Sequence, residues 1–134
     1  MGETVKNATV LVVDDHEDLL QFVKQVLASG GYQVFGALSG EEALTVAATI
    51  EGELDLLITD LVLPGITGGE LRERIRDSHP KCEAIYISGV SQKRIDELGL
   101  KYGATFLRKP FSSKQLLEAA EYKLLLKKNT VYVT

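Results

Sequence analysis

Short apolar segments alternate with segments of helical periodicity along the chain, and this alternation constrains the fold more than any other feature. Five apolar segments are present, and four of them are apolar almost throughout, as strands buried on both faces of a parallel sheet should be. The second is less apolar, which favours a position at the edge of a sheet. The expected strands are residues 9–13, 33–37, 54–59, 84–88 and 105–108.

The helical segments carry signals at their ends. The apolar stripe of the first ends at Gly30-Gly31, a common way for a helix to stop. The segment at about 91–101 has the weakest signal, because it is rich in charge and contains Gly99. The other three begin with capping boxes, in which a Ser or Thr precedes a Glu or Gln by three residues, at 39–42, 67–70 and 112–115.

Five strand–helix pairs in strict alternation predict an α/β fold. We expect a doubly wound, five-stranded parallel sheet with right-handed crossovers and helices on both faces. The common strand order of such a flavodoxin-like fold is 2-1-3-4-5, with a switch point between strands 1 and 3. The 134 residues are expected to form a single domain, 1–134, with a core at about 8–125 and a short C-terminal tail at 126–134.

Composition excludes several classes of function. A formal net charge of −4 with scattered basic residues argues against a nucleic-acid or anionic-membrane partner. Cys82 is the only cysteine, which excludes an intrachain disulfide and a thiolate metal cluster and predicts a small buried hydrophobe or an inert surface thiol. No apolar stretch approaches the roughly 18 residues of a membrane span. No signal peptide is visible, so we expect a cytoplasmic protein or a soluble piece of a larger one.

Polar side chains stand where the expected strands end. Asp14 and Asp15 follow the first strand, Asp60 follows the third, Ser88 closes the fourth, and Lys109 follows the fifth. Because open α/β sheets bind ligands at the carboxyl ends of their strands, we expect these side chains to converge at one edge. The combination of carboxylates, a hydroxyl and an ammonium group indicates a phosphate site assisted by a cation.

The carboxylates at this edge would repel one another. At about 4 Å and an effective dielectric constant near 20, each pair costs on the order of 4 kcal/mol. A hard divalent cation removes that repulsion, and oxygen ligands with open water positions suit Mg²⁺. We expect Asp15 and Asp60 to bind the ion, with Asp14 as a further ligand or directly behind them. The backbone carbonyl of Val62 is a further candidate, since the chain folds back before Pro64.

Each of these residues also has a plain structural interpretation. Asp14 and Asp15 could cap a helix, Ser88 could cap the next one, and Lys109 could be a surface lysine. Their joint occurrence at the strand ends favours a functional site. A Lys-Pro pair at a buried strand end also restricts the backbone, and the sequence leaves both the cis and the trans form of Lys109–Pro110 open.

The two histidines, His16 and His79, are expected on loops or first turns. His79 precedes Pro80 and is expected at the surface, whereas His16 follows the acidic pair and has a small chance of contacting the site. Neither has the spacing of a metal-binding motif.

The motifs at the strand ends are similar to those of one family in kind, order and spacing. Over about residues 8–125 the chain resembles the receiver domain of two-component response regulators. The resemblance is carried by Asp14-Asp15, Asp60 with a proline four residues on, Ser88-Gly89 and Lys109-Pro110-Phe111.

The resemblance implies that Asp60 is a phosphoacceptor. It would receive a phosphoryl group from a phosphohistidine on a histidine kinase or a histidine phosphotransfer domain. Asp14 and Asp15 would hold Mg²⁺, Ser88 would donate a hydrogen bond to the phosphoryl oxygens, and Lys109 would pair with them.

The resemblance further implies that Ser88 and Phe106 form a switch. Phe106 would occupy the space that Ser88 leaves on phosphorylation, and this would reshape the face made by the fourth helix, the fifth strand and the fifth helix. That face would signal to a partner or a linked domain, and a homodimer through it is left open. Strand alternation puts Arg108 on the same side as Phe106. The alternative for Phe106 is a plain core aromatic, which is ordinary on a strand.

Val62 and Val90 stand at two positions which, in the family, border the path of the water that hydrolyses the phosphoaspartate. Valine offers no group to orient a water. We therefore expect slow self-dephosphorylation.

A receiver would be a signalling domain, not an enzyme beyond its own phosphorylation and dephosphorylation. The alternative is a pseudo-receiver, an interaction domain without phosphorylation. An aspartyl phosphohydrolase would usually carry a second Asp two residues after the nucleophile, where this chain has Val62, and no glycine-rich phosphate loop follows the first strand. The stretches 63–71 and 87–89 are similar to receivers of hybrid histidine kinases, so a kinase domain, a piece of a longer regulator and a stand-alone receiver all stay open.

Overall fold

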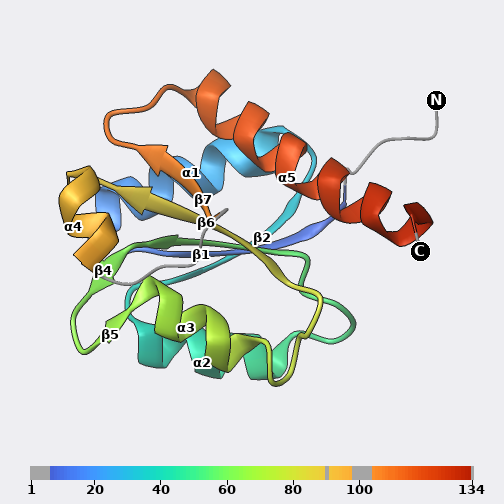
Figure 1. Cartoon of the computed structure of the whole chain (residues 1–134). Coiled ribbons are helices and arrows are strands. Elements are labelled where there is room, and N and C mark those ends of the chain that lie inside the picture. The colour runs from blue at the N-terminus through green and yellow to red at the C-terminus, as the bar shows by residue number, and fades with distance from the viewer. Residues whose placement is uncertain (1–6, 90, 98–103, 134) are drawn as a thin grey trace.

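A five-stranded parallel sheet runs through the centre of the protein, and helices cover both of its faces (Figure 1). The computed structural model describes residues 7–89, 91–97 and 104–133. The strand order is β2-β1-β3-β6-β7, which is the predicted order 2-1-3-4-5 when these five strands are counted along the chain. The strands are β1 (Thr9–Val13), β2 (Gln33–Ala37), β3 (Leu56–Asp60), β6 (Glu83–Ser88) and β7 (Thr105–Arg108). The predicted α/β fold is confirmed, with β2 at an edge.

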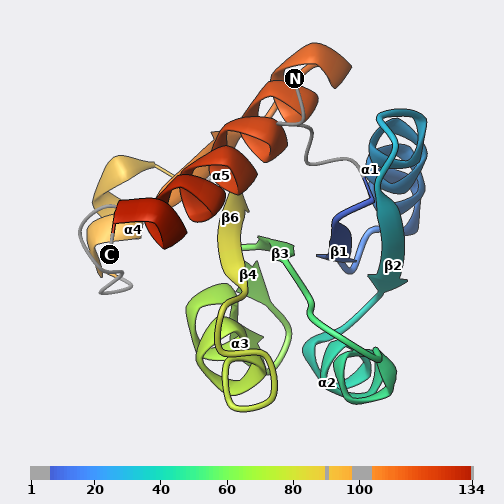
Figure 2. The ribbon, with the colours of Figure 1, turned by 90° about the vertical axis from the view of Figure 1, so that its right-hand side faces the viewer.

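The helices form two layers. Figure 2 shows α1 beside α5 on one side of the sheet and α2 beside α3 on the other. Ile95 of α4 belongs to the apolar cluster on the α2–α3 side. The helices are α1 (Glu17–Ser29), α2 (Gly40–Thr49), α3 (Gly68–Ile75), α4 (Gln92–Glu97) and α5 (Ser113–Val133).

Alternation along the strands divides the core between these layers. In β1, Val10 and Val12 pack on the α1–α5 side, whereas Leu11 and Val13 pack on the α2–α3 side. All four are 0% exposed, as is expected of a central strand with a helical layer on each face. Burial on both faces fixes the register of the strands, and therefore fixes which residues emerge together at their carboxyl ends.

Most helix ends follow the predicted signals. The boxes at Thr67–Glu70 and Ser112–Gln115 are reciprocal, with each N-cap hydroxyl accepting a backbone N–H and each Glu or Gln accepting the N-cap N–H. At α2, Ser39 Oγ accepts from the Glu42 N–H, but Glu42 Oε1 accepts from the N–H of Leu38 and not from that of Ser39. The predicted box at 39–42 is therefore only half formed. Residues 98–101 of the predicted fourth helix lie outside the described residues.

Three segments differ from the sequence prediction. The third strand begins at Leu56, two residues later than predicted. A short antiparallel pair, β4 (Val62–Leu63) and β5 (Ile66–Thr67), follows Asp60 and turns at Gly65, whose φ of 79° suits glycine. Helix α5 also continues to Val133, through residues that the sequence suggested as a tail.

His79 is buried, so the prediction that it lies at the surface is wrong. Its side chain sits between the end of α2 and the chain entering β3. Nδ1 accepts a hydrogen bond from the Leu54 N–H at 3.3 Å, so Nε2 carries the proton and donates to the Ala47 carbonyl oxygen at 2.9 Å. The imidazole thus satisfies the buried Leu54 N–H and adds a second donor to the Ala47 carbonyl, which also accepts from the Ile50 N–H at 3.3 Å.

Two further expectations concern residue placement. Cys82 is 1% exposed, with Sγ 3.4 Å from the Glu83 carbonyl oxygen, so it is the buried hydrophobe of the two predicted alternatives. Within the described ranges, none of the helices combines the length and the apolar character needed to cross a membrane.

Replacing His79 by alanine should destabilise the domain. His79→Ala leaves the buried Leu54 N–H without its partner and removes one of the two donors to the Ala47 carbonyl, which should lower the free energy of unfolding by about 1–3 kcal/mol. Urea denaturation measures this change. Lys81→Ala, at an exposed position nearby, is the control and should change stability by less than about 0.5 kcal/mol. Equal losses in the two variants would contradict the role assigned to His79.

Candidate functional site

A pocket of about 220 Å³ lies at the carboxyl edge of the sheet, where the sequence analysis expected a site. Four of the five predicted residues line it, and the fifth, Asp14, lies beside them with its carboxylate in the same acidic cluster. The lining residues are Asp15, His16, Asp60, Leu61, Val62, Ile87, Ser88, Gly89 and Lys109.

Asp60 ends a strand that is buried along its entire length. It pairs in register with Ile87 of β6, and it is only 6% exposed. The backbone around it is held closely by the start of α3. A Cβ atom on Gly68 would lie 2.5 Å from the Asp60 carbonyl oxygen, so only glycine allows α3 to begin here. The Gly68 N–H also donates to the Leu61 carbonyl at 2.8 Å, which fixes the chain just after Asp60.

Asp14 supplies a second buried carboxylate. Its side chain is 0% exposed, and Oδ1 accepts a hydrogen bond from the His16 N–H at 2.8 Å. Oδ2 is buried and has no hydrogen-bond partner within the part of the chain that the structure describes. One ligand atom each from Asp14, Asp15, His16 and Asp60 lie within 4.8 Å of one another. An unpaired buried carboxylate oxygen inside a cluster of oxygen donors fits a hard divalent cation such as Mg²⁺.

The electrostatics of Asp60 reflect this crowding. Burial, followed by the nearby Asp14 carboxylate, raises the pKa of Asp60 from 3.8 to about 6, although Lys109 acts in the opposite direction. Lys109 Nζ lies 3.3 Å from Asp60 Oδ1, and its side chain is 33% exposed. One partly exposed ammonium therefore does not balance the two buried acids. A cation in the cluster would lower the pKa of Asp60 and keep it ionised.

Ser88 and Lys109 are held together by the β6–β7 edge. Ser88 is 2% exposed at the end of β6, and its carbonyl accepts from the Lys109 N–H at 2.9 Å. The Lys109–Pro110 peptide bond is cis, which settles the alternative that the sequence left open. Both residues line the pocket that contains Asp60. The pocket thus combines a serine and a lysine with the same carboxylate.

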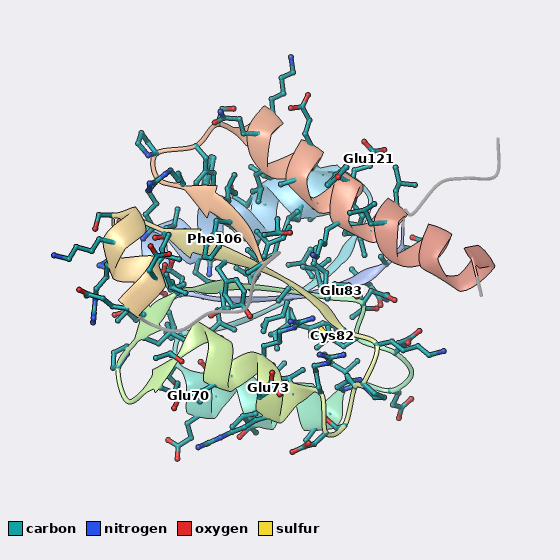
Figure 3. All side chains as sticks on the ribbon, viewed as in Figure 1. Glu70, Glu73, Cys82, Glu83, Phe106 and Glu121 are labelled. Atoms are coloured by element: carbon teal, nitrogen blue, oxygen red, sulfur yellow. The ribbon has the colours of Figure 1, made fainter. Side chains whose placement is uncertain are left out.

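Phe106 is partly buried on β7, an edge strand flanked by α4 and α5 (Figure 3). Its ring lies 5.8 Å from that of Tyr86, at an interplanar angle of 40°. Tyr86 stands two residues before Ser88 and is 3% exposed. Tyr86 was not among the residues predicted for the switch, although strand alternation puts it on the same face of β6 as Ser88. Arg108, two residues after Phe106, is exposed.

The structure places His16 in the site, where the sequence analysis gave it only a small chance. Its Nδ1 lies 3.3 Å from Asp14 Oδ1 and 3.4 Å from Asp15 Oδ1, and its side chain is 73% exposed. The signal that could have found it is its position directly after the acidic pair, at the N-cap of α1.

Of the two valines expected near the hydrolytic water, Val62 lines the pocket and is 45% exposed. Val90 lies outside the described residues. The interpretation of the Val62 carbonyl as a metal ligand stays a prediction.

Comparisons with known proteins agree with this geometry. Residues 10–121 match the family described as the response regulator receiver domain. The chain is 37% identical over 125 residues to the sensor kinase CckA of Brucella abortus, covering 91% of this chain and 13% of that protein. It is 31% identical to the alkaline phosphatase synthesis transcriptional regulatory protein PhoP of Bacillus subtilis, covering 93% of this chain and 51% of that protein. The chain thus spans about half or less of these relatives.

Solved structures give the same result. A response regulator receiver domain protein from Clostridium thermocellum superposes with a TM-score of 0.79 at 30% identity, covering 92% of this chain and 98% of that one. The receiver domain of the hybrid histidine kinase CckA superposes with a TM-score of 0.74 at 33% identity, covering 87% and 99% of the two chains.

The raised pKa of Asp60 predicts a pH-dependent effect of neutralising it. A carboxyl group whose pKa is higher in the folded state stabilises the fold at low pH, and that contribution is lost as the pH rises through about 6. In metal-free buffer, Asp60→Asn should therefore raise the free energy of unfolding by about 1–2 kcal/mol near pH 7, and the gain should vanish near pH 4. Urea denaturation across this range measures it.

The matched control is Asp77→Asn, at an exposed position after α3. It should show no such pH-dependent gain. A stability of Asp60→Asn that is equal to or below that of the wild type near pH 7 would show that the ion pair with Lys109 outweighs burial and the repulsion from Asp14.

Proposed function

The chain belongs to the response regulator receiver domain family, and we propose that it is a phosphorylation-switched receiver in which Asp60 is the phosphoacceptor. The observation that carries the proposal is the meeting at Asp60 of an acidic cluster that could hold a cation, a lysine and a serine. Asp60 Oδ1 lies 3.3 Å from Lys109 Nζ, and Ser88 lines the same pocket. This set matches the requirements of phosphoryl transfer, which are an in-line nucleophile and positive charge around the phosphoryl oxygens.

In the proposed reaction, Asp60 attacks the phosphorus of a phosphohistidine. An oxygen–phosphorus bond forms to the carboxylate as the phosphorus–nitrogen bond breaks, and the imidazole of the donor leaves with the bonding pair and takes up a proton. Lys109 pairs with a phosphoryl oxygen, and Ser88 donates its hydroxyl hydrogen to another.

The bound metal, Mg²⁺ in the family, would supply positive charge to the carboxylates and to the phosphoryl oxygens. Asp15 and Asp60 would hold it, with Asp14 as a further ligand or directly behind them and the Val62 carbonyl as an additional candidate. The unpaired Asp14 Oδ2 supports this assignment, because a buried carboxylate oxygen without a partner is costly. Neutralising the cluster would also keep Asp60 ionised, as a nucleophile must be.

Phosphorylation would change the surface around β7. Ser88 would move toward the phosphoryl group, and Phe106 would turn into the space that it leaves, next to Tyr86. The contact between the two rings supports this path, because Tyr86 and Ser88 lie on one face of β6. The face formed by α4, β7 and α5 would then present a different surface to a partner or a linked domain.

The partners proposed are those of two-component systems. A histidine kinase or phosphotransfer domain would donate the phosphoryl group, and an output domain or partner would respond to the α4–β7–α5 face. Relatives that include both a sensor kinase and a transcriptional regulator support this proposal without favouring one setting over the other. A homodimer through the same face is a further arrangement that the proposal allows.

Phosphorylation can be tested directly by intact mass. After incubation with Mg²⁺ and acetyl phosphate, the wild type should gain the mass of one phosphoryl group, and hydroxylamine should remove it. Asp60→Asn should gain nothing, whereas the exposed control Asp77→Asn should behave as the wild type. If the wild type binds Mg²⁺ but gains no mass with either acetyl phosphate or a phosphohistidine donor, the chain is a pseudo-receiver and the proposal is wrong.

The lifetime of the phosphoaspartate should depend on Val62. Because this exposed apolar side chain offers nothing to orient a water, Val62→Asn should shorten the half-life of the phosphorylated protein by several-fold, and combining it with Val90→Glu should shorten it further. Loss of the phosphoryl group, followed by mass over time, gives the half-life. Val62→Ile keeps an apolar side chain and should leave the half-life unchanged. A longer half-life in the polar variants would contradict the prediction.

A further inference from the structure

His16 stands out because it adds a nitrogen donor to a cluster that is otherwise made of carboxylates. Its backbone is tied to the cluster, since the His16 N–H donates to Asp14 Oδ1 at 2.8 Å. The residue also occupies the N-cap of α1, but its side chain makes no capping hydrogen bond there. The imidazole therefore does not cap the start of the helix.

The imidazole instead faces the acids. Nδ1 lies 3.3 Å from Asp14 Oδ1 and 3.4 Å from Asp15 Oδ1, and the ring forms part of the wall of the pocket. Its ligand atom and those of the three carboxylates lie within 4.8 Å of one another. Two ligands on opposite sides of one ion stand about 4.2 Å apart, so the four donors are nearly close enough to share a single cation. With 73% of the side chain exposed, the ring can turn to present either nitrogen.

A second observation indicates that a cation belongs here. Asp14 Oδ2 is buried in this cluster and has no partner among the residues that the structure describes. A positive ion is the simplest group that satisfies a buried carboxylate oxygen surrounded by other acids.

The kind of donor decides which cation is favoured. Mg²⁺ prefers oxygen ligands and gives up its waters reluctantly, whereas imidazole suits Fe²⁺, Ni²⁺, Cu²⁺ and Zn²⁺. We propose that His16 is a cation ligand of this site and gives it a preference for first-row transition-metal dications over Mg²⁺. The inference rests on the cation site of the proposed function, and it adds the residue that sets the selectivity of that site.

If His16 had only a structural role, its removal would affect the binding of different cations in a different way. If the imidazole only donates a hydrogen bond to the carboxylates of Asp14 and Asp15, its removal changes the charge of the site in the same way for every divalent cation. If the imidazole is a ligand, its removal lowers the affinity of the site only for those cations that favour nitrogen ligands. The ratio of two affinities therefore separates the two roles.

The test compares Co²⁺ and Mg²⁺ binding to the untagged, unphosphorylated protein by calorimetry. His16→Asn is the test variant, because asparagine is favoured at an N-cap and should keep α1 intact. It should weaken Co²⁺ binding by about tenfold or more while Mg²⁺ binding changes by less than about twofold. Asp15→Asn is the comparison variant. It should weaken the binding of both Co²⁺ and Mg²⁺, which would assign the two ions to the same cluster.

Proton NMR with Co²⁺ gives a second readout. Directly bound imidazole shows strongly shifted ring resonances, and these should be present in the wild type and absent in His16→Asn. The other histidine, His79, does not interfere, because its two nitrogens bond the Leu54 N–H and the Ala47 carbonyl.

Three results would overturn the inference. Equal weakening of Co²⁺ and Mg²⁺ binding in His16→Asn would assign His16 a purely electrostatic or structural role. Unchanged affinities for both metals, with no shifted resonances in the wild type, would remove it from the site. Both leave the proposed function intact, since Mg²⁺ still binds. Failure of the wild type to bind either metal would contradict the proposed function as well.

Discussion

The close approach of two buried carboxylates, Asp14 and Asp60, is the constraint on which the rest of the site depends. The first is 0% exposed and the second 6%, and burial, followed by the nearby Asp14 carboxylate, raises the pKa of Asp60 to about 6. Lys109 offsets this only in part, because it is a single, partly exposed ammonium. A fold that kept such a pair for stability alone would gain by replacing it with apolar residues. The proposed binding of a cation and a phosphoryl group at this site accounts for the pair.

The parallel sheet makes this pairing unavoidable. The two carboxylates follow neighbouring strands, β1 and β3, at the point where the strand order reverses. Helices on both faces bury these strands, so their register is fixed and both acids emerge at the same edge. Gly68 then allows α3 to begin directly against the Asp60 backbone. The same edge brings Ser88 and Lys109 to the pocket from β6 and β7.

The sequence predicts most of this because the relevant signals are local. Apolar strands, helix caps and the polar residue after each strand are read within a few positions, and topology rules supply the strand order. The predictions that failed concern residues whose contacts join parts of the chain that are distant in sequence or depend on backbone geometry. His79 looks like a surface residue beside Pro80, yet it pairs backbone groups of Leu54 and Ala47, which are distant in the chain. His16 enters the site through its backbone bond to Asp14, which no spacing rule predicts.

In the proposed function, the acidic cluster needs a cation to keep Asp60 ionised. The most direct test is the pKa of Asp60, measured from its side-chain carboxyl carbon by NMR titration with and without Mg²⁺. In metal-free buffer the pKa of Asp60 should be about 6, and it should fall clearly when Mg²⁺ is added. A pKa near 3.8 that does not respond to Mg²⁺ would contradict this proposal, because Asp60 would then be neither crowded by Asp14 nor part of a cation site.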